Sequence, residues 1–369
     1  MELVLLRYAE LSLKGGNRKE YIRRLRRNVR DCLAEHDIKG RVESVHRRLY
    51  VWTDDADVAV EHLARVFGLA SLSPAIAVPW DMSAIVAESV RQAREAGGGA
   101  VVSFRVRVKR ADKTFPHTSP EIERLVGRAI LGSVGGKVDL SDKADITIGI
   151  EVSRERAIIF HRVVPGYGGF PIGIEGRVVA LISGGIDSPA AAWMMMKRGC
   201  GVIPVHFAQN EIEKSKALDN IEVLRRYSYG WELRPIVQDH KEVIGDVLER
   251  LRGAKESRWT CIFCKRALLL RASRIAEELG AHAVVMGDSL GQVASQSLAN
   301  LEAVSLEIPK PILRPLIGME KLEIIDLAKE IGTFDVSIRD QQGCPFLPSH
   351  PITAADMDEF REVRQKIGV

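Results

Sequence analysis

A glycine-rich turn between an apolar run and a candidate helix is the segment best suited to chemistry. Residues 178–182 are typical of a buried strand, and the next six residues are Ser183, Gly184, Gly185, Ile186, Asp187 and Ser188. Glycines let backbone amides approach an anion, and the helix that Ser188 and Pro189 favour adds a positive field at its N-terminus. Asp187 among phosphates would orient Mg²⁺ or a substrate group. No lysine follows the glycines, so this is not the Gly-Lys-Ser/Thr nucleotide loop. A tight turn without a ligand is the alternative.

Three of the five cysteines form a second candidate centre. Cys261 and Cys264 are a C-x-x-C pair, and Cys344 lies 80 residues further along the chain. Thiolates at this spacing can bind one metal ion or one edge of a cluster, and three of them leave one iron of a cubane cluster open to another ligand such as sulfide. The alternatives are zinc with His350 as a weak fourth ligand, a redox disulfide between Cys261 and Cys264, and three unrelated buried thiols.

The turn and the cysteine pair lie in a region of alternating strands and helices. It follows a glycine-rich segment at 165–176 that predicts a linker. Strands are predicted at 177–182, 201–207, 233–237 and 282–286, and helices at 188–198, 212–227, 241–252, 264–279 and 320–331. This alternation favours an α/β class, a doubly wound domain with a mostly parallel sheet, in which ligands bind beyond the carboxyl ends of the strands.

Residues 1–75 predict a small α+β unit. Strands are expected at 2–8, 41–53 and 74–79, and helices at 18–37 and near 56–67. The exposed face of the first helix carries Arg23, Arg24, Arg26, Arg27 and Arg30. Such a face is either a patch that binds nucleic acid or an ordinary solvated surface.

Residues 76–168 predict a second α+β unit with a row of cations on one strand. We expect helices at 83–96 and near 120–133, and strands at 101–110, 145–152 and 156–164. In the strand 101–110, apolar residues alternate with cations. The cations of this strand and of the residues after it are Arg105, Arg107, Lys109, Arg110 and Lys113. They suit a phosphate backbone, and because no aromatic residue lies between them, stacking on unpaired bases is not indicated.

Composition limits the class of protein. The chain has 369 residues, 46% hydrophobic and 28% charged, which excludes a disordered or fibrous protein and predicts several domains. No apolar run approaches the ~20 residues of a membrane span, and the polar N-terminus contains no signal-peptide core. Five cysteines are too few for a secreted disulfide scaffold, so we expect a cytoplasmic protein. Cys32 and Cys200 are interpreted as core residues.

The charge is uneven along the chain. Residues 1–170 hold 28 Lys and Arg against 22 Asp and Glu, whereas the remainder holds 25 against 27. The basic surplus of the first part indicates a polyanionic partner there.

Four segments of the chain resemble motifs of known protein families. Residues 183–188 resemble the pyrophosphatase loop of the PP-loop ATPases, which cleave ATP between the α and β phosphates and adenylate a carbonyl oxygen. Residues 7–15, 104–116 and 287–296 resemble, in this order, the opening, the THUMP domain and a second ATP-site stretch of the tRNA 4-thiouridine synthetase (ThiI) family. The resemblance covers nearly the whole chain. It implies a ferredoxin-like domain at 1–75, a THUMP RNA-binding domain at 76–168 and a PP-loop ATP pyrophosphatase domain at 169–369.

The resemblance also implies which residues form the site. The implied ATP contacts are Leu181, Ile182, Ser183, Gly184, Gly185, Asp187, Ser188, His206, Phe207, Lys265, Gly287 and Gln296. Asp187 is the essential acid of the family. Cys261, Cys264 and Cys344 resemble the cysteines of archaeal members that bind an iron–sulfur cluster, 4Fe-4S or 3Fe-4S. Cys344 also matches the catalytic cysteine of members with a C-terminal rhodanese domain, a domain not expected in a chain that ends at Val369.

The expected activity is that of an ATP-dependent tRNA sulfurtransferase. It would adenylate a tRNA uridine, by family expectation at position 8, and replace O4 with sulfur to give 4-thiouridine. The expected cofactors are ATP, Mg²⁺ and the cluster, and the partners are tRNA, a sulfur donor (sulfide or a persulfide carrier) and a second copy of the chain, with no membrane. The alternatives are 2-thiolation of a tRNA base by the same chemistry, an RNA-binding protein with a non-catalytic ATP site, and a metabolic PP-loop ligase.

Overall fold

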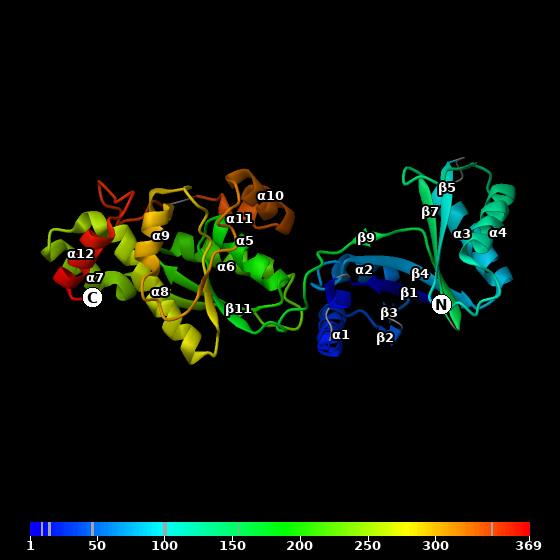
Figure 1. Ribbon diagram of the computed structural model, residues 1–369, viewed down its shortest axis with the longest axis horizontal. Coiled ribbons are helices and arrows are strands. Elements are labelled where there is room, and N and C mark those ends of the chain that lie inside the picture. The colour runs from blue at the N-terminus through cyan, green and yellow to red at the C-terminus, as the bar shows by residue number, and fades with distance from the viewer. Residues whose placement is uncertain (9, 14–15, 46–47, 99–101, 154, 341) are drawn as a thin grey trace. The chain divides into compact units, whose positions relative to one another are not determined.

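The chain forms two compact units, Met1–Phe170 and Pro171–Val369, called the N-terminal and the C-terminal unit below (Figure 1). The structure, a computed structural model, describes residues 1–8, 10–13, 16–45, 48–98, 102–153, 155–340 and 342–369. No helix among these residues is both long enough and apolar enough to cross a bilayer.

A nine-stranded sheet runs through the whole N-terminal unit. Its strand order is β2-β3-β1-β4-β8-β7-β5-β6, and β9 also pairs with β4. The first part comprises β1 (Glu2–Arg7), a 3₁₀ turn (Glu10–Leu13), α1 (Arg18–Glu35), β2 (Arg41–Val45), β3 (Arg48–Trp52), α2 (Ala56–Leu63) and β4 (Ser71–Pro79). The predicted strand at 41–53 is therefore two antiparallel strands. Residues 46 and 47 between them, and residues 9, 14 and 15 of the segment 7–15, lie outside the described residues. Strand β4 crosses residue 75 and pairs with β1 on one side and β8 on the other.

The second part of this unit places the cation row. It comprises α3 (Met82–Gly97), β5 (Ser103–Arg110), α4 (Ser119–Ser133), β6 (Lys137–Val138), β7 (Ile146–Val152), β8 (Arg156–Phe160) and β9 (Val164–Pro165). Phe104 and Val106 of β5 are buried with Ile85 of α3 and Ile122 of α4, so the two helices cover one face of the strand. Val101, where this strand was predicted to begin, lies outside the described residues.

The C-terminal unit is built on a five-stranded sheet in which every pair is parallel. The strand order is β12-β11-β10-β13-β14. Its first elements are β10 (Arg177–Leu181), α5 (Asp187–Lys197), β11 (Gly201–Ala208), α6 (Glu211–Arg225), β12 (Ile236–Asp239) and α7 (His240–Gly253). Strands β11 and β13 flank β10, so the strand order reverses there and a ligand crevice is expected at its carboxyl end. The predicted fold class is confirmed.

The second part of the C-terminal unit carries the cysteines. Its elements are a 3₁₀ turn (Ser257–Trp259), α8 (Thr260–Glu278), β13 (Ala283–Val285), a 3₁₀ turn (Ala294–Gln296), α9 (Leu298–Ser305), β14 (Ile312–Leu313), α10 (Lys321–Ile331), α11 (Phe334–Ser337) and α12 (Met357–Ile367). Trp259, Phe263 and Leu269 of this part form one core cluster with Val179 of β10 and Phe360 of α12.

Two predicted boundaries in this unit are wrong. Helix α8 begins at Thr260 rather than at 264, because Ile262, Phe263, Arg266 and Leu269 keep one helical face buried from the first turn. The strand expected at 233–237 begins at 236, because Pro235 has no N–H with which to join the ladder. The first change matters for function, since it places both cysteines of the pair on a helix.

Candidate active site

A cavity of about 460 Å³ opens at the carboxyl ends of β10 and β11. The twelve residues predicted to contact ATP all line it, namely Leu181, Ile182, Ser183, Gly184, Gly185, Asp187, Ser188, His206, Phe207, Lys265, Gly287 and Gln296. The fold therefore brings together segments that lie more than 100 residues apart in the sequence. The cavity also contains residues that were not predicted, among them Glu213, His240 and Asp288.

The turn after β10 is held by a hydrogen bond between its two serines, and two glycines at this site lie very close to neighbouring groups. Ser188 Oγ accepts a hydrogen bond from the Ser183 N–H at 2.8 Å. A Cβ at Gly184 would lie 2.4 Å from Glu213 Oε2, and one at Gly287 would lie 2.7 Å from the Ser188 nitrogen. Gly287 therefore requires glycine because backbone atoms fill the space, whereas at Gly184 a Cβ would displace the end of the Glu213 side chain and press on Lys216 Cβ at 3.0 Å.

Asp187 is the acid at the start of α5, and donors from two distant segments hold both of its oxygens. Lys321 Nζ, at the first residue of α10, donates to Oδ1 at 2.6 Å, and Gln292 Nε2 donates to Oδ2 at 3.0 Å. No lysine follows the glycines in the sequence, and Lys321 was not among the predicted site residues. No local signal could have found Lys321, because only the fold brings α10 to the turn.

Asp288 organises the cationic side of the cavity. It is 3% exposed and accepts hydrogen bonds from Lys265 Nζ at 3.1 Å, from Arg314 Nε at 3.1 Å and from Gln296 Nε2 at 3.4 Å. Burial alone would raise the pKa of Asp288, but the charges and hydrogen bonds of Lys265 and Arg314 outweigh it and lower the pKa. Asp288 thus stays ionised and fixes two of the predicted ATP contacts.

Two acceptors in this cavity have no partner among the described residues. His206 Nδ1 lies 2.8 Å from the Ile182 carbonyl oxygen, to which it must donate, so Nε2 keeps its lone pair. Burial lowers the pKa of His206 and keeps the ring neutral. His206 Nε2 and Gln296 Oε1 are both buried without a hydrogen bond. Since buried polar atoms are normally paired, the arrangement suits a ligand with N–H or O–H donors.

The three cysteines lie near one another beside this cavity. Cys261 and Cys264 occupy the first two turns of α8, three residues apart and hence on one face. Burial, followed by the charges of Cys344 and Cys261, raises the pKa of Cys264 to about 12. Burial and Cys344 likewise raise the pKa of Cys261. Cys344 is exposed.

No three His, Cys, Asp or Glu side chains among the described residues converge in a way that could hold a single metal ion. The zinc alternative, with His350 as a fourth ligand, gains no support from this geometry. Cys32 and Cys200 are buried core residues, as expected.

The cations predicted to bind RNA differ in whether they are already hydrogen-bonded within the protein. Arg105 donates to Thr147 Oγ1 at 2.8 Å and also pairs with Asp142. Arg107 donates to the Leu140 carbonyl at 3.0 Å, and Arg110 donates to the His117 carbonyl at 2.9 Å. Three of the five cations are thus anchored to the protein itself.

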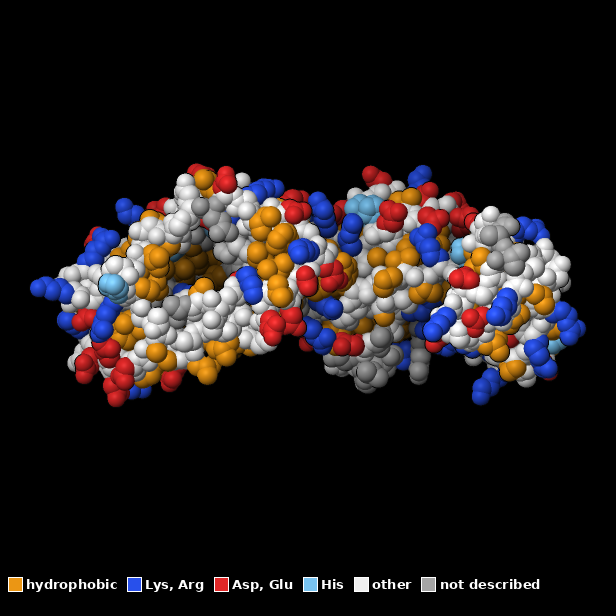
Figure 2. Space-filling view, turned by 90° about the horizontal axis from the view of Figure 1, so that it is seen from above, with side chains coloured by type: hydrophobic (Ala, Val, Ile, Leu, Met, Phe, Trp, Pro, Cys, Tyr) orange, Lys and Arg blue, Asp and Glu red, His pale blue; other side chains and the backbone are white. Residues whose placement is uncertain are grey.

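The two predicted lysines are the free members of the row. Lys109 and Lys113 are exposed and have no partner among the described residues. On the face shown in Figure 2, the Lys and Arg side chains of the N-terminal unit alternate with acidic ones rather than forming one patch.

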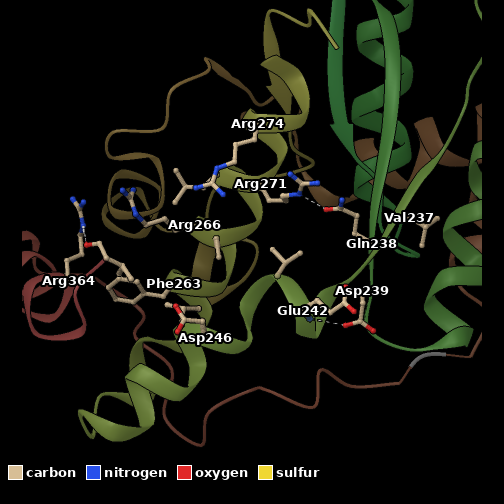
Figure 3. Close-up of a pocket in the computed structure, with 15 residues that line it drawn as sticks. Val237, Gln238, Asp239, Glu242, Asp246, Phe263, Arg266, Arg271, Arg274 and Arg364 are labelled. Atoms are coloured by element: carbon tan, nitrogen blue, oxygen red, sulfur yellow. Dashed lines mark hydrogen bonds between the residues drawn. The ribbon is translucent and has the colours of Figure 1, made fainter. Parts of the chain in front are cut away.

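A larger cavity of about 910 Å³ lies between α7, α8 and α12 and contains none of the predicted residues. Its charged side chains, seen in Figure 3, are Arg266, Arg271, Arg274 and Arg364 and, around the start of α7, Asp239, Glu242 and Asp246. Its lining contains no glycine turn. The smaller cavity is therefore the candidate active site.

Family models match the chain in three consecutive segments. Residues 3–73 match the ThiI ferredoxin-like domain, residues 81–162 the THUMP domain, and residues 173–369 the thiamine biosynthesis protein (ThiI). These matches confirm the family resemblance inferred from the motifs.

Similar proteins cover almost the whole chain. The probable tRNA sulfurtransferase of Methanocaldococcus jannaschii is 41% identical over 99% of this chain and 97% of its own, and that of Thermococcus kodakarensis is 40% identical over the same shares. A solved 4-thiouridine synthetase–RNA complex with bound ATP superposes with a TM-score of 0.89 at 32% identity, covering 100% of this chain and 95% of that one. The solved structure of PH1313 from Pyrococcus horikoshii superposes with a TM-score of 0.74 at 28% identity, covering 90% of this chain and 100% of that one. The chain belongs to the ThiI family.

Proposed function

We propose that this chain is an ATP-dependent tRNA sulfurtransferase that makes 4-thiouridine, by family expectation at position 8. The observation that carries the proposal is the cavity that joins the glycine turn and Asp187 to Lys265, the residue of α8 that directly follows the cysteine pair. Relatives named probable tRNA sulfurtransferases and a solved 4-thiouridine synthetase with RNA and ATP support it. Its domains would be ferredoxin-like (1–75), THUMP (76–168) and PP-loop (169–369).

ATP would bind with its phosphates on the turn 183–188 and its adenosine against β10 and β11. The backbone amides of Gly184 and Gly185 and the N-terminus of α5 stabilise the phosphate charge. His206 Nε2 and Gln296 Oε1 are unpaired acceptors that suit the amino group of adenine or the ribose hydroxyls. Asp187 fits Mg²⁺ by its donor chemistry, and the ion would neutralise phosphate charge after the Lys321 ammonium leaves the carboxylate.

The chemistry follows from where the cations lie. The uridine O4 attacks the α phosphorus, the uracil loses its N3 proton, and the bond to the β phosphate breaks to release pyrophosphate. Lys265, which lines the cavity, and Lys321, which is bonded to Asp187 at the start of α5, would stabilise the charge on the leaving group. Hydrosulfide then adds at C4, AMP departs with O4, and the base regains its N3 proton as 4-thiouridine.

The thiols at the start of α8, together with Cys344, fit an iron–sulfur cluster held by Cys261, Cys264 and Cys344. The two helical thiols share one face, and the charge that Cys344 would carry reaches both of them. A cluster is broader than one ion, so its thiolates need not converge on a single point. Such a cluster would supply an iron with an open position for sulfide. Cys344, the exposed thiol, would otherwise carry the sulfur as a persulfide.

The remaining partners follow from charge and from family. The THUMP segment, with its free Lys109 and Lys113, would bind tRNA, and sulfide or a persulfide carrier would supply the sulfur. The functional form would be a homodimer.

The test is an anaerobic reaction with unmodified tRNA, ATP and sulfide. We expect 4-thiouridine in the digested tRNA by mass spectrometry, together with release of pyrophosphate. Asp187→Asn should abolish pyrophosphate release and leave tRNA affinity largely intact. Formation of 2-thiouridine would move the reaction to another atom of the base. ATP binding without pyrophosphate release would make the chain an RNA-binding protein with a non-catalytic ATP site.

A further inference from the structure

His240 connects the nucleotide cavity with the thiols of α8. It is 2% exposed, it lines the cavity, and its Nε2 atom lies 3.4 Å from Cys264 Sγ. Its ring is stacked on Phe346, with centroids 5.5 Å apart and 23° between the planes. Phe346 follows Cys344 by two residues. His240 therefore contacts the Cys264 thiol directly, and by stacking on Phe346 it also contacts the segment that carries Cys344.

The fold fixes His240 at this place. Strand β12 ends at Asp239, whose side chain caps α7 by accepting a hydrogen bond from the Glu242 N–H at 3.0 Å. His240 is the first residue of that helix, so it lies at the carboxyl edge of the parallel sheet, where ligands bind. Its other ring nitrogen, Nδ1, is buried and has no partner among the described residues.

We propose that His240 is a positioning residue of the sulfur centre, which donates a hydrogen bond from Nε2–H to the Cys264 thiolate and, through Phe346, holds the segment that carries Cys344. The role rests on the proposed cluster. A thiolate offers only lone pairs, so it selects the ring tautomer with its proton on Nε2. The donated hydrogen bond stabilises negative charge on the sulfur, and it stabilises the reduced cluster more than the oxidised one.

The two contacts of His240 can be separated by substitution. His240→Phe keeps a ring to stack on Phe346 and removes the donor. His240→Gln keeps an N–H donor and removes the aromatic stack. Phe346→Leu removes the stack and leaves the imidazole in place. His350→Phe is the matched control, since His350 is an exposed histidine in the same C-terminal segment.

The experiment measures iron and acid-labile sulfide per chain after anaerobic reconstitution, and the midpoint potential of the bound cluster. We expect His240→Phe to load iron and to shift the potential to more negative values, and His240→Gln to return it toward the wild-type value. Phe346→Leu should bind less iron, because the Cys344 segment is held less firmly. His350→Phe should match the wild type, and the melting temperature of each variant, measured by circular dichroism, reports whether it is folded.

The outcomes separate this role from the proposed function. A wild-type chain that takes up no iron overturns both the cluster and the role of His240, and leaves the ATP and tRNA chemistry standing. A wild type that loads a cluster, with His240→Phe showing the same potential and the same absorbance spectrum, overturns the role of His240 alone. Equal loss of iron, together with a lowered melting temperature, in both His240 variants would also overturn it, since that pattern marks a residue that only supports the fold.

Discussion

Lys321 donates a hydrogen bond of 2.6 Å to Asp187, a residue 134 positions earlier in the chain. The glycine turn that begins α5 contains no lysine, yet the fold supplies one from the first turn of α10. The proposed phosphate-binding turn is therefore completed by a second segment, whose ammonium neutralises the acid.

Lys321→Met should slow adenylation strongly. Loss of one preorganised cationic donor at developing phosphate charge costs about 10²–10³-fold in rate. We expect this loss in pyrophosphate release at saturating ATP, with tRNA affinity unchanged. Lys329→Met is the control, because Lys329 is an exposed lysine of the same helix that pairs with Asp326. Equal rates for Lys321→Met and the wild type would exclude a role in catalysis.

Gly184→Ala should damage the turn, whereas Gly185→Ala should not. The new Cβ at 184 would lie 2.4 Å from Glu213 Oε2, but at 185 the nearest atom, Ser183 Oγ, is 3.6 Å away at ordinary contact distance. We expect a lower Tm and weaker ATP binding for Gly184→Ala, and a wild-type Tm for Gly185→Ala. Two variants with the same Tm would mean that Glu213 moves aside at no cost.

Asp288→Asn should destabilise the C-terminal unit at neutral pH. It leaves Lys265 and Arg314 without their buried carboxylate, a change that costs about 3–5 kcal/mol of unfolding free energy. Asp246→Asn, at an exposed pair with Arg250, should cost about 1 kcal/mol or less. Urea unfolding followed by circular dichroism measures both.

The stabilisation from Asp288 also has a pH signature. Its pKa is lowered in the folded state, so its contribution is complete above the ordinary pKa of an aspartate. It is then lost as the pH falls through the lowered, folded-state value. We therefore expect the difference between the wild type and Asp288→Asn to shrink only in strong acid. A difference that already disappears at neutral pH would contradict an ionised Asp288.

Cys261→Ser should abolish iron binding. The proposed cluster has three protein ligands, and the two thiolates that remain in this variant would hold it poorly. Iron and acid-labile sulfide, measured with an absorbance spectrum after anaerobic purification, check this expectation. Cys32→Ala removes a buried thiol of the N-terminal unit and should leave the iron content unchanged. Zinc in the wild type would instead assign the cysteines a structural role.

Lys109→Ala and Lys113→Ala should each weaken tRNA binding without changing stability. Both lysines are exposed and unpaired among the described residues, and each lost phosphate contact lowers the slope of affinity against salt by about one. Arg105→Ala should lower the Tm as well, because its guanidinium pairs with Thr147 and Asp142. Filter binding over a salt series measures the slopes, and Lys143→Ala is the exposed control.

The candidate site divides into a part that sequence could predict and a part that it could not. Residues 181–188 are contiguous, and their types already define a strand, a phosphate-binding turn and a helix start. The motif resemblance then led to His206, Lys265 and Gln296, which line the same cavity. Gln292 and Lys321 were missed because their roles come from contacts with Asp187 across the fold.

The cysteine helix shows why boundaries are harder to predict than elements. The sequence predicts a helix from residue 264, which includes Cys264 and leaves Cys261 before the helix. The buried faces of Ile262 and Phe263 instead extend α8 back to Thr260. This shift of four residues turns two neighbouring thiols into a helical pair, and that geometry could not be deduced from the spacing alone.

Strand β4 has a consequence for how the N-terminal unit is cut and unfolded. One edge of β4 pairs with β1 and the other pairs with β8, so the ferredoxin-like and THUMP segments share a single hydrogen-bonded sheet. A fragment that begins after β4 would expose the full edge of β8, a template for aggregation. Heat or denaturant should therefore melt residues 1–170 as one cooperative block, and truncations in this protein family are better placed at the glycine-rich segment after Val164.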